Sequence, residues 1–181
     1  DFAREFGGIA IISDRNMASD RAAIPLVIAL SAINQKLIEE GLRLKISVVA
    51  ESGQIASSHH VACALGFGAS AVYPLAVRLR AEELVGFNDA ATALQMFVKA
   101  AEKALLKTMG KVGLCTVESY IGGEFFEPNF LDTRDSVLVK YFPNMRTPVG
   151  GVGFSSIARS ATDWHSFAKK VSKSEDIPIL C

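Results

Sequence analysis

The sequence predicts an α/β fold in which short parallel strands alternate with helices. Three β-branched runs, at residues 7–14, 45–51 and 71–73, end in polar residues or are stopped by a proline. Segments with helical periodicity lie between the runs, and the connections are short. Strands joined in this way run parallel through right-handed crossovers, so the residues alone predict an α/β layer or a (β/α) barrel.

The first strand and first helix have the clearest patterns. Residues 7–14 (GGIAIISD) are apolar without alternation, which is typical of a parallel strand covered on both faces. Pro25 is placed where a helix can begin, and Gly41 where it can end. Between them, apolar residues recur at helical spacing: Leu26, Leu30, Ile33 and Leu37.

The second helix is short and is predicted to join the second strand to the third. Ser57 or Ser58 can cap a helix over residues 59–65, because a serine oxygen accepts from the free amides of a first turn. Residues 66–68 (GFG) then close the helix tightly. The third strand, residues 71–73, is stopped by Pro74.

A longer helix is predicted to begin at Asn88 or Asp89 and to end between Gly110 and Gly113. Its expected buried stripe consists of Leu94, Val98, Ala101 and Leu105, and its expected solvated row of Lys99, Lys103 and Lys107. Residues 114–120 (LCTVESY) are a fourth candidate strand.

The periodicity weakens after residue 120, where glycine and proline are frequent. We expect two regions: a βαβαβαβ unit over residues 1–120, and an irregular Gly/Pro-rich segment with a helical tail over residues 121–181. Within the second region, residues 156–173 are predicted to form one polar helix.

Composition excludes several classes of protein. Half of the 181 residues are hydrophobic, and Lys plus Arg equals Asp plus Glu at 19 each, so no nucleic-acid-binding surface is indicated. No apolar run reaches membrane-spanning length. Cys63, Cys115 and Cys181 lie far apart, which argues against a zinc site or a locally ligated iron–sulfur cluster and fits the cytoplasm.

Both ends of the sequence look cut. It begins Asp-Phe-Ala-Arg without an initiator methionine and ends just after a strand-like segment at residues 177–179. A chain with zero net charge and this much apolar residue would risk self-association unless it were packed against neighbours. We therefore expect a piece of a larger protein.

Polar residues follow the predicted strands, at the edge where parallel α/β folds bind ligands. We expect them to cluster at one rim as a polar pocket, although strand ends are routinely polar and these groups can equally satisfy loop amides. The candidates are Ser13, Asp14, Arg15, Glu51, Ser52, Gly53 and Tyr73, together with His59 and His60.

Two further features have a functional and a structural interpretation. Residues 51–72, a strand ending in Ser-Gly, a short helix and a Gly-Ala-x-Ala-Val strand, resemble a βαβ unit of flavin-binding barrels whose strand-end loops hold the flavin phosphate, but tight packing requires the same small residues. His59 and His60 are adjacent, so their side chains diverge around a helix and a shared metal is disfavoured. We expect these histidines to cap a helix or anchor a loop. Cys63 nearby is expected to be a small buried residue rather than a nucleophile.

Nine segments together carry a resemblance to a known family. They are residues 11–15 (IISDR), 24–25 (IP), 40–43 (EGLR), 49–53 (VAESG), 59–60 (HH), 65–74 (LGFGASAVYP), 102–109 (EKALLKTM), 111–120 (KVGLCTVESY) and 150–154 (GGVGF). In this order and spacing they resemble the central domain of the glutamate synthase large chain. The chain departs from the family pattern at Gln54 and Ile55, where an acidic and a basic residue are usual, at Ile121, and at residues 147–149.

The resemblance implies a fold and a role. The fold would be a partial (β/α) TIM-like barrel of parallel strands leading toward an FMN domain. In this family, ammonia released from glutamine passes through a tunnel to a flavin barrel, where 2-oxoglutarate becomes glutamate. Electrons arrive through FMN and an iron–sulfur cluster, from ferredoxin or an NADPH-linked small subunit. The central domain mainly braces the amidotransferase and FMN domains and helps to wall the ammonia route.

We therefore expect a structural segment without catalytic residues, bound cofactor or metal, whose partners are neighbouring domains of the same large chain. Two alternatives stay open. One is a stand-alone partial-barrel module that binds a phosphate-containing ligand such as FMN. The other is a small independent enzyme that uses Asp14, Arg15 and Glu51.

Overall fold

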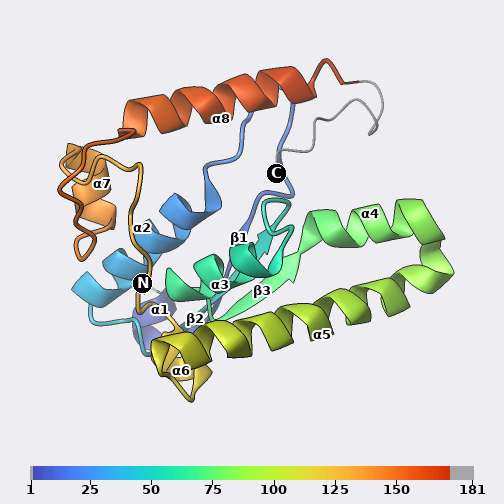
Figure 1. Cartoon of the computed structure of the whole chain (residues 1–181), viewed down its shortest axis with the longest axis horizontal. Helices are drawn as coiled ribbons and strands as arrows, with labels where there is room; N and C mark the ends of the chain where they lie inside the picture. The colour runs from blue at the N-terminus through green and yellow to red at the C-terminus, as the bar shows by residue number, and fades with distance from the viewer. Residues whose placement is uncertain (1, 172–181) are drawn as a thin grey trace.

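The computed structural model describes residues 2–171, so the strand-like residues 177–179 lie outside the described part (Figure 1). The elements in chain order are α1 (Phe2–Glu5), β1 (Gly8–Ser13), α2 (Leu26–Glu39), β2 (Ile46–Ser52), α3 (Ser58–Gly66), β3 (Ala71–Pro74), α4 (Leu75–Val85), α5 (Phe87–Val112), α6 (Val117–Tyr120), α7 (Ser136–Tyr141) and α8 (Phe154–Ala168). Within residues 2–171, no helix combines the length and apolarity needed to cross a membrane.

The three strands form one parallel sheet in the order β1-β2-β3. Gly8 pairs with Ile46 and Ser13 with Glu51, so β1 and β2 are in register along the whole of β1. Right-handed crossovers in this strand order place α2 and α3 on the same face of the sheet. The predicted α/β fold with parallel strands is confirmed.

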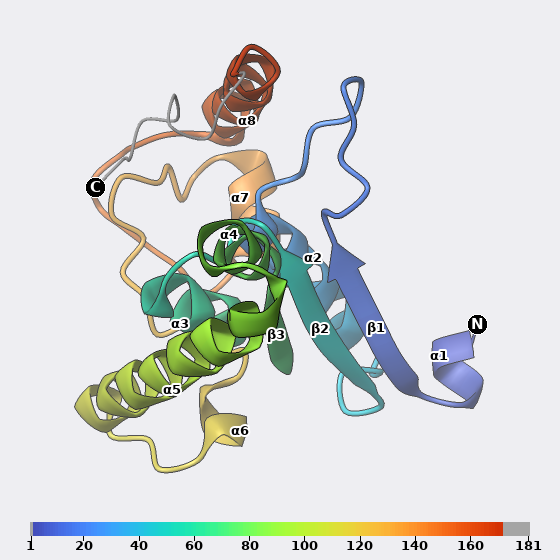
Figure 2. The ribbon, with the colours of Figure 1, turned by 90° about the vertical axis from the view of Figure 1, so that its right-hand side faces the viewer.

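The core lies between that face and the two crossover helices. Val48 and Ala50 of β2 are buried there, together with Leu30 of α2 and Ala64 of α3. On the opposite face, Ile9 and Ile11 of β1 are 71% and 66% exposed. The sheet is therefore covered by helices of this chain on one face, and its other face is largely open at β1 (Figure 2).

Helices α2 and α3 begin and end as predicted. Helix α2 follows Pro25 and stops before Gly41, whose φ of 68° ends the helical conformation. In α3, Oγ of Ser57 accepts the backbone N–H of His60, which identifies Ser57 as the capping residue.

The buried face of α5 differs from the predicted stripe at one position. Ala101 is buried and Leu94 and Leu105 are half-buried, but Val98 is 41% exposed while Phe97 packs against the core. Helix α5 lies alongside α3 and α4, and Val98 lies at the rim of a shallow apolar pocket between α3, β3 and α5. The expected solvated lysines are exposed: Lys99, Lys103 and Lys107.

The predicted fourth strand at residues 114–120 is wrong. Residues 117–120 form the helical turn α6, and the chain that follows bonds to the end of α3 instead of to the edge of β3. The N–H of Gly122 donates to Leu65 O at 3.0 Å, and that of Glu124 to Gly66 O at 3.0 Å. These bonds join the segment after α6 to the last carbonyls of α3, a contact that depends on packing rather than on strand propensity.

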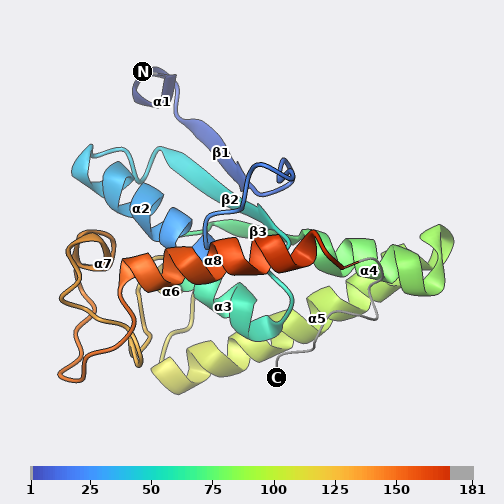
Figure 3. The same ribbon diagram turned by 90° about the horizontal axis from the view of Figure 1, so that it is seen from above.

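Helix α4 was not predicted from the sequence. Leu75 and Leu79 share one face but Leu84 lies on the opposite one, so its sequence carries little amphipathic signal. It is supported by the pairs Arg78–Glu82 and Arg80–Glu83 on its surface and by packing against α5 as a helical hairpin (Figure 3). Residues 121–153 are loops around α7. The tail helix α8 spans Phe154–Ala168, so it begins two residues before the predicted 156–173 and ends earlier; residues 172–173 lie outside the described part.

One buried junction holds the amino end of the sheet together. The half-buried guanidinium of Arg43 donates to Asn34 Oδ1 at 2.7 Å, Ile46 O at 2.9 Å and Gly68 O at 3.0 Å. It thereby links α2, β2 and the loop before β3. Burial lowers the pKa of Arg43 from its usual value.

Gly68 is the position at this junction that accepts no side chain. Its φ is +110°, and an added Cβ would lie 2.6 Å from the side chain of Asn34. We expect Gly68→Ala to lower the free energy of unfolding by about 1–3 kcal/mol, because the substitution combines backbone strain with a clash. Urea unfolding would measure the loss.

Gly110, in α5, provides the matched control. Nothing lies within 4 Å of an added Cβ there, and its backbone is helical. Gly110→Ala should be neutral or stabilise by up to about 1 kcal/mol. Equal losses for the two variants would contradict the role assigned to the Gly68 junction.

Candidate functional site

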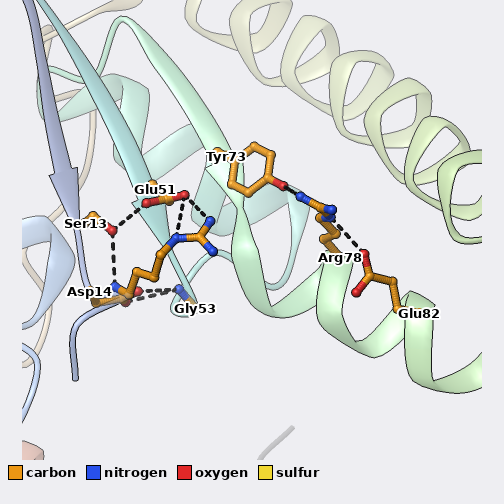
Figure 4. Close-up of polar contacts among 8 residues, drawn as sticks. Ser13, Asp14, Glu51, Gly53, Tyr73, Arg78 and Glu82 are labelled. Atoms are coloured by element: carbon orange, nitrogen blue, oxygen red, sulfur yellow. Dashed lines mark hydrogen bonds and ion pairs between the residues drawn. The ribbon is translucent and has the colours of Figure 1, made fainter. Parts of the chain in front are cut away.

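The polar residues predicted at the strand ends do meet at one rim of the sheet (Figure 4). The carboxylate of Asp14 accepts the N–H of Gly53, at 3.0 and 3.1 Å to its two oxygens, and the hydroxyl of Ser52 at 2.5 Å. Ser52 is buried. Asp14, at the end of β1, therefore satisfies the backbone and hydroxyl of the loop after β2.

Glu51 is the centre of a second set of contacts. Its Oε2 accepts the hydroxyl of Ser13 at 2.5 Å, and its Oε1 accepts Nε of Arg15 at 3.2 Å and a second Arg15 nitrogen. Hydrogen bonding by Arg15, and then by Ser13, holds the pKa of Glu51 below its usual value. The same bond to Glu51 raises the pKa of Arg15. This pair remains charged at neutral pH and ties the β1 loop to β2.

A third set of contacts extends the rim to α4. Arg78 donates to Tyr73 Oη at 2.6 Å and to Glu82 Oε1 at 3.0 Å, and the bond to Tyr73 is the main cause of its raised pKa. Arg78 and Glu82 were missed by the sequence analysis. Their i, i+4 spacing directly after the third strand is the signal that could have found them.

The rim acts as a brace between secondary-structure elements. Each of its charged side chains is bonded to another residue of the rim, and Glu51 is held ionised by an arginine rather than poised to exchange a proton. A shallow pocket of about 280 Å³ lies beside it, with Asp14, Ser52 and Gln54 in its wall. Among the described residues, no group of three His, Cys, Asp or Glu side chains could hold a metal ion.

The adjacent histidines have local structural contacts. The N–H of Ala56 donates to Nδ1 of His60 at 3.2 Å, which anchors the loop before α3. Burial, followed by the nearby His59, lowers the pKa of His60. Nε2 of His59 lies 3.5 Å from Sγ of Cys63, whose pKa is raised by burial. A thiol with a raised pKa is a poor nucleophile.

The glycine-containing loop before β3 offers no free amides for a phosphate. The N–H of Gly68 donates to Leu65 O, that of Ala69 to Ala64 O, and that of Ser70 to Val48 O. The loop also leads into the amino end of β3, opposite the rim where phosphates bind in parallel α/β folds. The geometry therefore favours packing over phosphate binding.

Gln54 and Ile55, two residues that depart from the family pattern, have structural roles. Oε1 of Gln54 accepts the N–H of Leu26 at 2.9 Å, and its Nε2 donates to Ile24 O at 3.1 Å. Gln54 thus caps α2, whose preceding Pro25 has no side-chain donor or acceptor. Ile55 is fully buried in the core.

The family model described as glutamate synthase central domain matches residues 2–131. The chain belongs to this family. The match covers the whole sheet, its crossover helices and the α4–α5 hairpin.

The chain is similar to large chains of several electron-donor classes. It is 35% identical over 164 residues to the NADPH glutamate synthase large chain of Bacillus subtilis, covering 87% of this chain and 10% of the relative. It is 33% identical over 171 residues to the ferredoxin-dependent enzyme of Cyanidium caldarium, covering 86% and 11%. It is also 33% identical over 161 residues to the NADH enzyme of Schizosaccharomyces pombe, covering 86% and 8%. The chain thus spans about a tenth of the length of these relatives.

Because of the Glu51–Arg15 ion pair, we expect the stability of the fold to decrease at acid pH. Because the pKa of Glu51 is lower in the folded chain than its usual 4.5, the ionised carboxylate stabilises the fold. That contribution is complete above pH 4.5 and is lost as the pH falls through the lowered folded pKa. We expect Glu51→Gln to lower Tm at pH 7, and the difference from wild type to shrink as the pH falls below 4.5.

Melting curves from pH 7 to pH 3 would measure this dependence. Glu118→Gln is a suitable control, because it makes the same change at an exposed position outside the rim. A Tm difference for Glu51→Gln that stays constant down to acid pH would contradict the electrostatic explanation.

Proposed function

We propose that this chain is a structural segment of a flavin- and iron–sulfur-dependent glutamate synthase, which forms two glutamates from glutamine and 2-oxoglutarate. In that enzyme it would brace the amidotransferase and FMN domains and help to wall the ammonia route. Membership of the central-domain family and the small share of the relatives that it spans support this proposal.

The proposal rests on a contrast in this structure: polar side chains at the strand ends are bonded within the chain, whereas large apolar side chains are exposed. The strand-end polar groups, which a catalytic domain would offer to substrate, are bonded to one another. Large apolar side chains instead face outward on several sides, among them Ile9 and Ile11 of β1, Leu106 of α5 and Trp164 of α8. Such surfaces are typical of a domain that packs against others.

We also propose that the open sheet is part of a partial (β/α) TIM-like barrel. Three consecutive parallel strands with both crossovers on one face have the arrangement of successive barrel units. In this proposal the region up to residue 120 is the barrel segment. Residues 121–181 would lead toward the next domain.

The residues here do not suit the cofactors of the family. Flavin phosphate needs free backbone amides, but those after β2 and before β3 are bonded within the chain. A cluster needs several convergent thiolates, and the described cysteines, Cys63 and Cys115, are separate and free. We therefore propose that FMN and the iron–sulfur cluster are held elsewhere in a cytoplasmic large chain. Ferredoxin or an NADPH-linked subunit would serve that whole enzyme, and no observation here favours a stand-alone flavin-binding module.

The size of the native protein tests the proposal directly. An immunoblot of source cells with antibody against this chain should show a band several times heavier than 19.4 kDa. A single band near 19.4 kDa would contradict the proposal, because the segment would then act without neighbouring domains.

A pair of substitutions in the large chain tests the bracing role. Leu106 of α5 is 64% exposed and apolar, whereas its neighbour Lys107 belongs to the solvated row. We expect Leu106→Glu to lower the glutamate formed per glutamine hydrolysed by about tenfold, because a charge in an apolar interface disturbs domain packing. Lys107→Glu introduces the same residue and should leave the ratio within about twofold of wild type. An unchanged ratio in Leu106→Glu would contradict a bracing contact at this face.

A further inference from the structure

The strand β1 has one edge that is unpaired within the described residues. The order β1-β2-β3 leaves its outer side without a strand between residues 2 and 171, and Figure 2 shows β1 at the margin of the sheet. Gly8 and Asp14 donate their N–H groups to Lys45 O and Glu51 O of the β2 side. Because these groups alternate in direction along a strand, the N–H and C=O of Ile9 and Ile11 point away from β2.

The sequence of β1 lacks the features that protect an edge strand. Residues 8–13 (GIAIIS) contain no charge and no proline, and the pairing with β2 has no bulge. Ile9 and Ile11 present exposed side chains on the face away from the helices. A strand of this composition is typical of the buried interior of a parallel sheet, not of its margin.

The helix before β1 approaches from the side that a further βαβ unit would use. Helix α1 is tied to the end of α2 by the Arg4–Glu40 ion pair, and Nζ of Lys45 contacts Arg4 O. In a right-handed βαβ unit, a helix leading into β1 lies on the same face as α2, and the strand before it lies beside β1. The position of α1 fits the last turn of such a crossover helix.

We infer that the free edge of β1 pairs with one further parallel strand supplied by the same large chain. This inference rests on the proposed function. The added strand would be an extended, β-branched apolar segment whose carbonyls accept the N–H groups of Ile9 and Ile11. Relatives about ten times as long as this chain provide the additional sequence for it. A second copy of the chain is the less favoured occupant, because so short an edge buries far less area than a stable dimer needs.

Hydrogen exchange in the intact large chain tests the inference at single amides. The N–H groups of Ala10 and Ile12 face β2 and serve as internal controls. We expect the amides of Ile9 and Ile11 to be protected to within about tenfold of those controls. Exchange of Ile9 and Ile11 about a hundredfold or more faster than the controls would overturn the inference. Protection that disappears on dilution would also overturn it, because a second copy would then be the occupant.

Two substitutions at Ile11 distinguish the effect of losing a backbone hydrogen bond at the strand edge from the effect of changing the side chain on the sheet face. Ile11→Pro removes the outward N–H without removing a bond to β2, whereas Ile11→Thr keeps that N–H and the β-branched shape. In the large chain, Ile11→Pro should shorten the half-life of thermal inactivation about tenfold, and Ile11→Thr less than about threefold. Equal effects, or no effect of proline, would overturn the inference.

Failure of this inference is distinguishable from failure of the proposed function. An unprotected β1 edge in a large chain would leave the bracing role standing. A native protein of 19.4 kDa would remove both.

Discussion

The central strand β2 is the element on which the other parts of this fold depend. It bonds to β1 on one side and to β3 on the other, and its inward side chains, among them Val48 and Ala50, are buried beneath the crossover helices. The Arg43 junction holds its amino end, and the Glu51–Arg15 and Asp14–Gly53 contacts hold its carboxyl end. Register, helix placement and rim geometry therefore follow from one strand.

The polar groups at the rim are bonded to one another, while several large apolar side chains on the periphery are exposed. A catalytic carboxylate needs a pKa suited to proton transfer, whereas Arg15 and Ser13 keep Glu51 ionised. The hydrogen-bonding capacity of the strand ends is used to join β1, β2 and α4. Large apolar side chains such as Leu106 and Trp164 are exposed, which supports the proposed packing between domains.

Several parts of the fold were predictable because their signals are local. Pro25, Gly41 and Ser57 mark helix ends through backbone conformation and capping, which neighbouring residues determine. The convergence of Asp14 and Glu51 was predictable because parallel strands end at one edge. Helix α4 was missed because its stability comes from surface ion pairs and from packing against α5. Residues 114–120 were assigned to a strand because propensity does not reveal that the chain directly after them bonds to the end of α3, through Gly122 and Glu124.

By itself, the sequence determined the parallel α/β class, the family and the rim residues at the strand ends, but not Arg78 and Glu82 of α4. These depend on periodicity, turn chemistry and ordered motifs along the chain. Only the tertiary structure decided that Asp14 accepts the N–H of Gly53, that Glu51 is paired with Arg15, and that the amides around Gly68 are bonded within the chain. The physical reason is that hydrogen-bond partners are chosen by distance and direction in space, between residues that lie far apart in the chain.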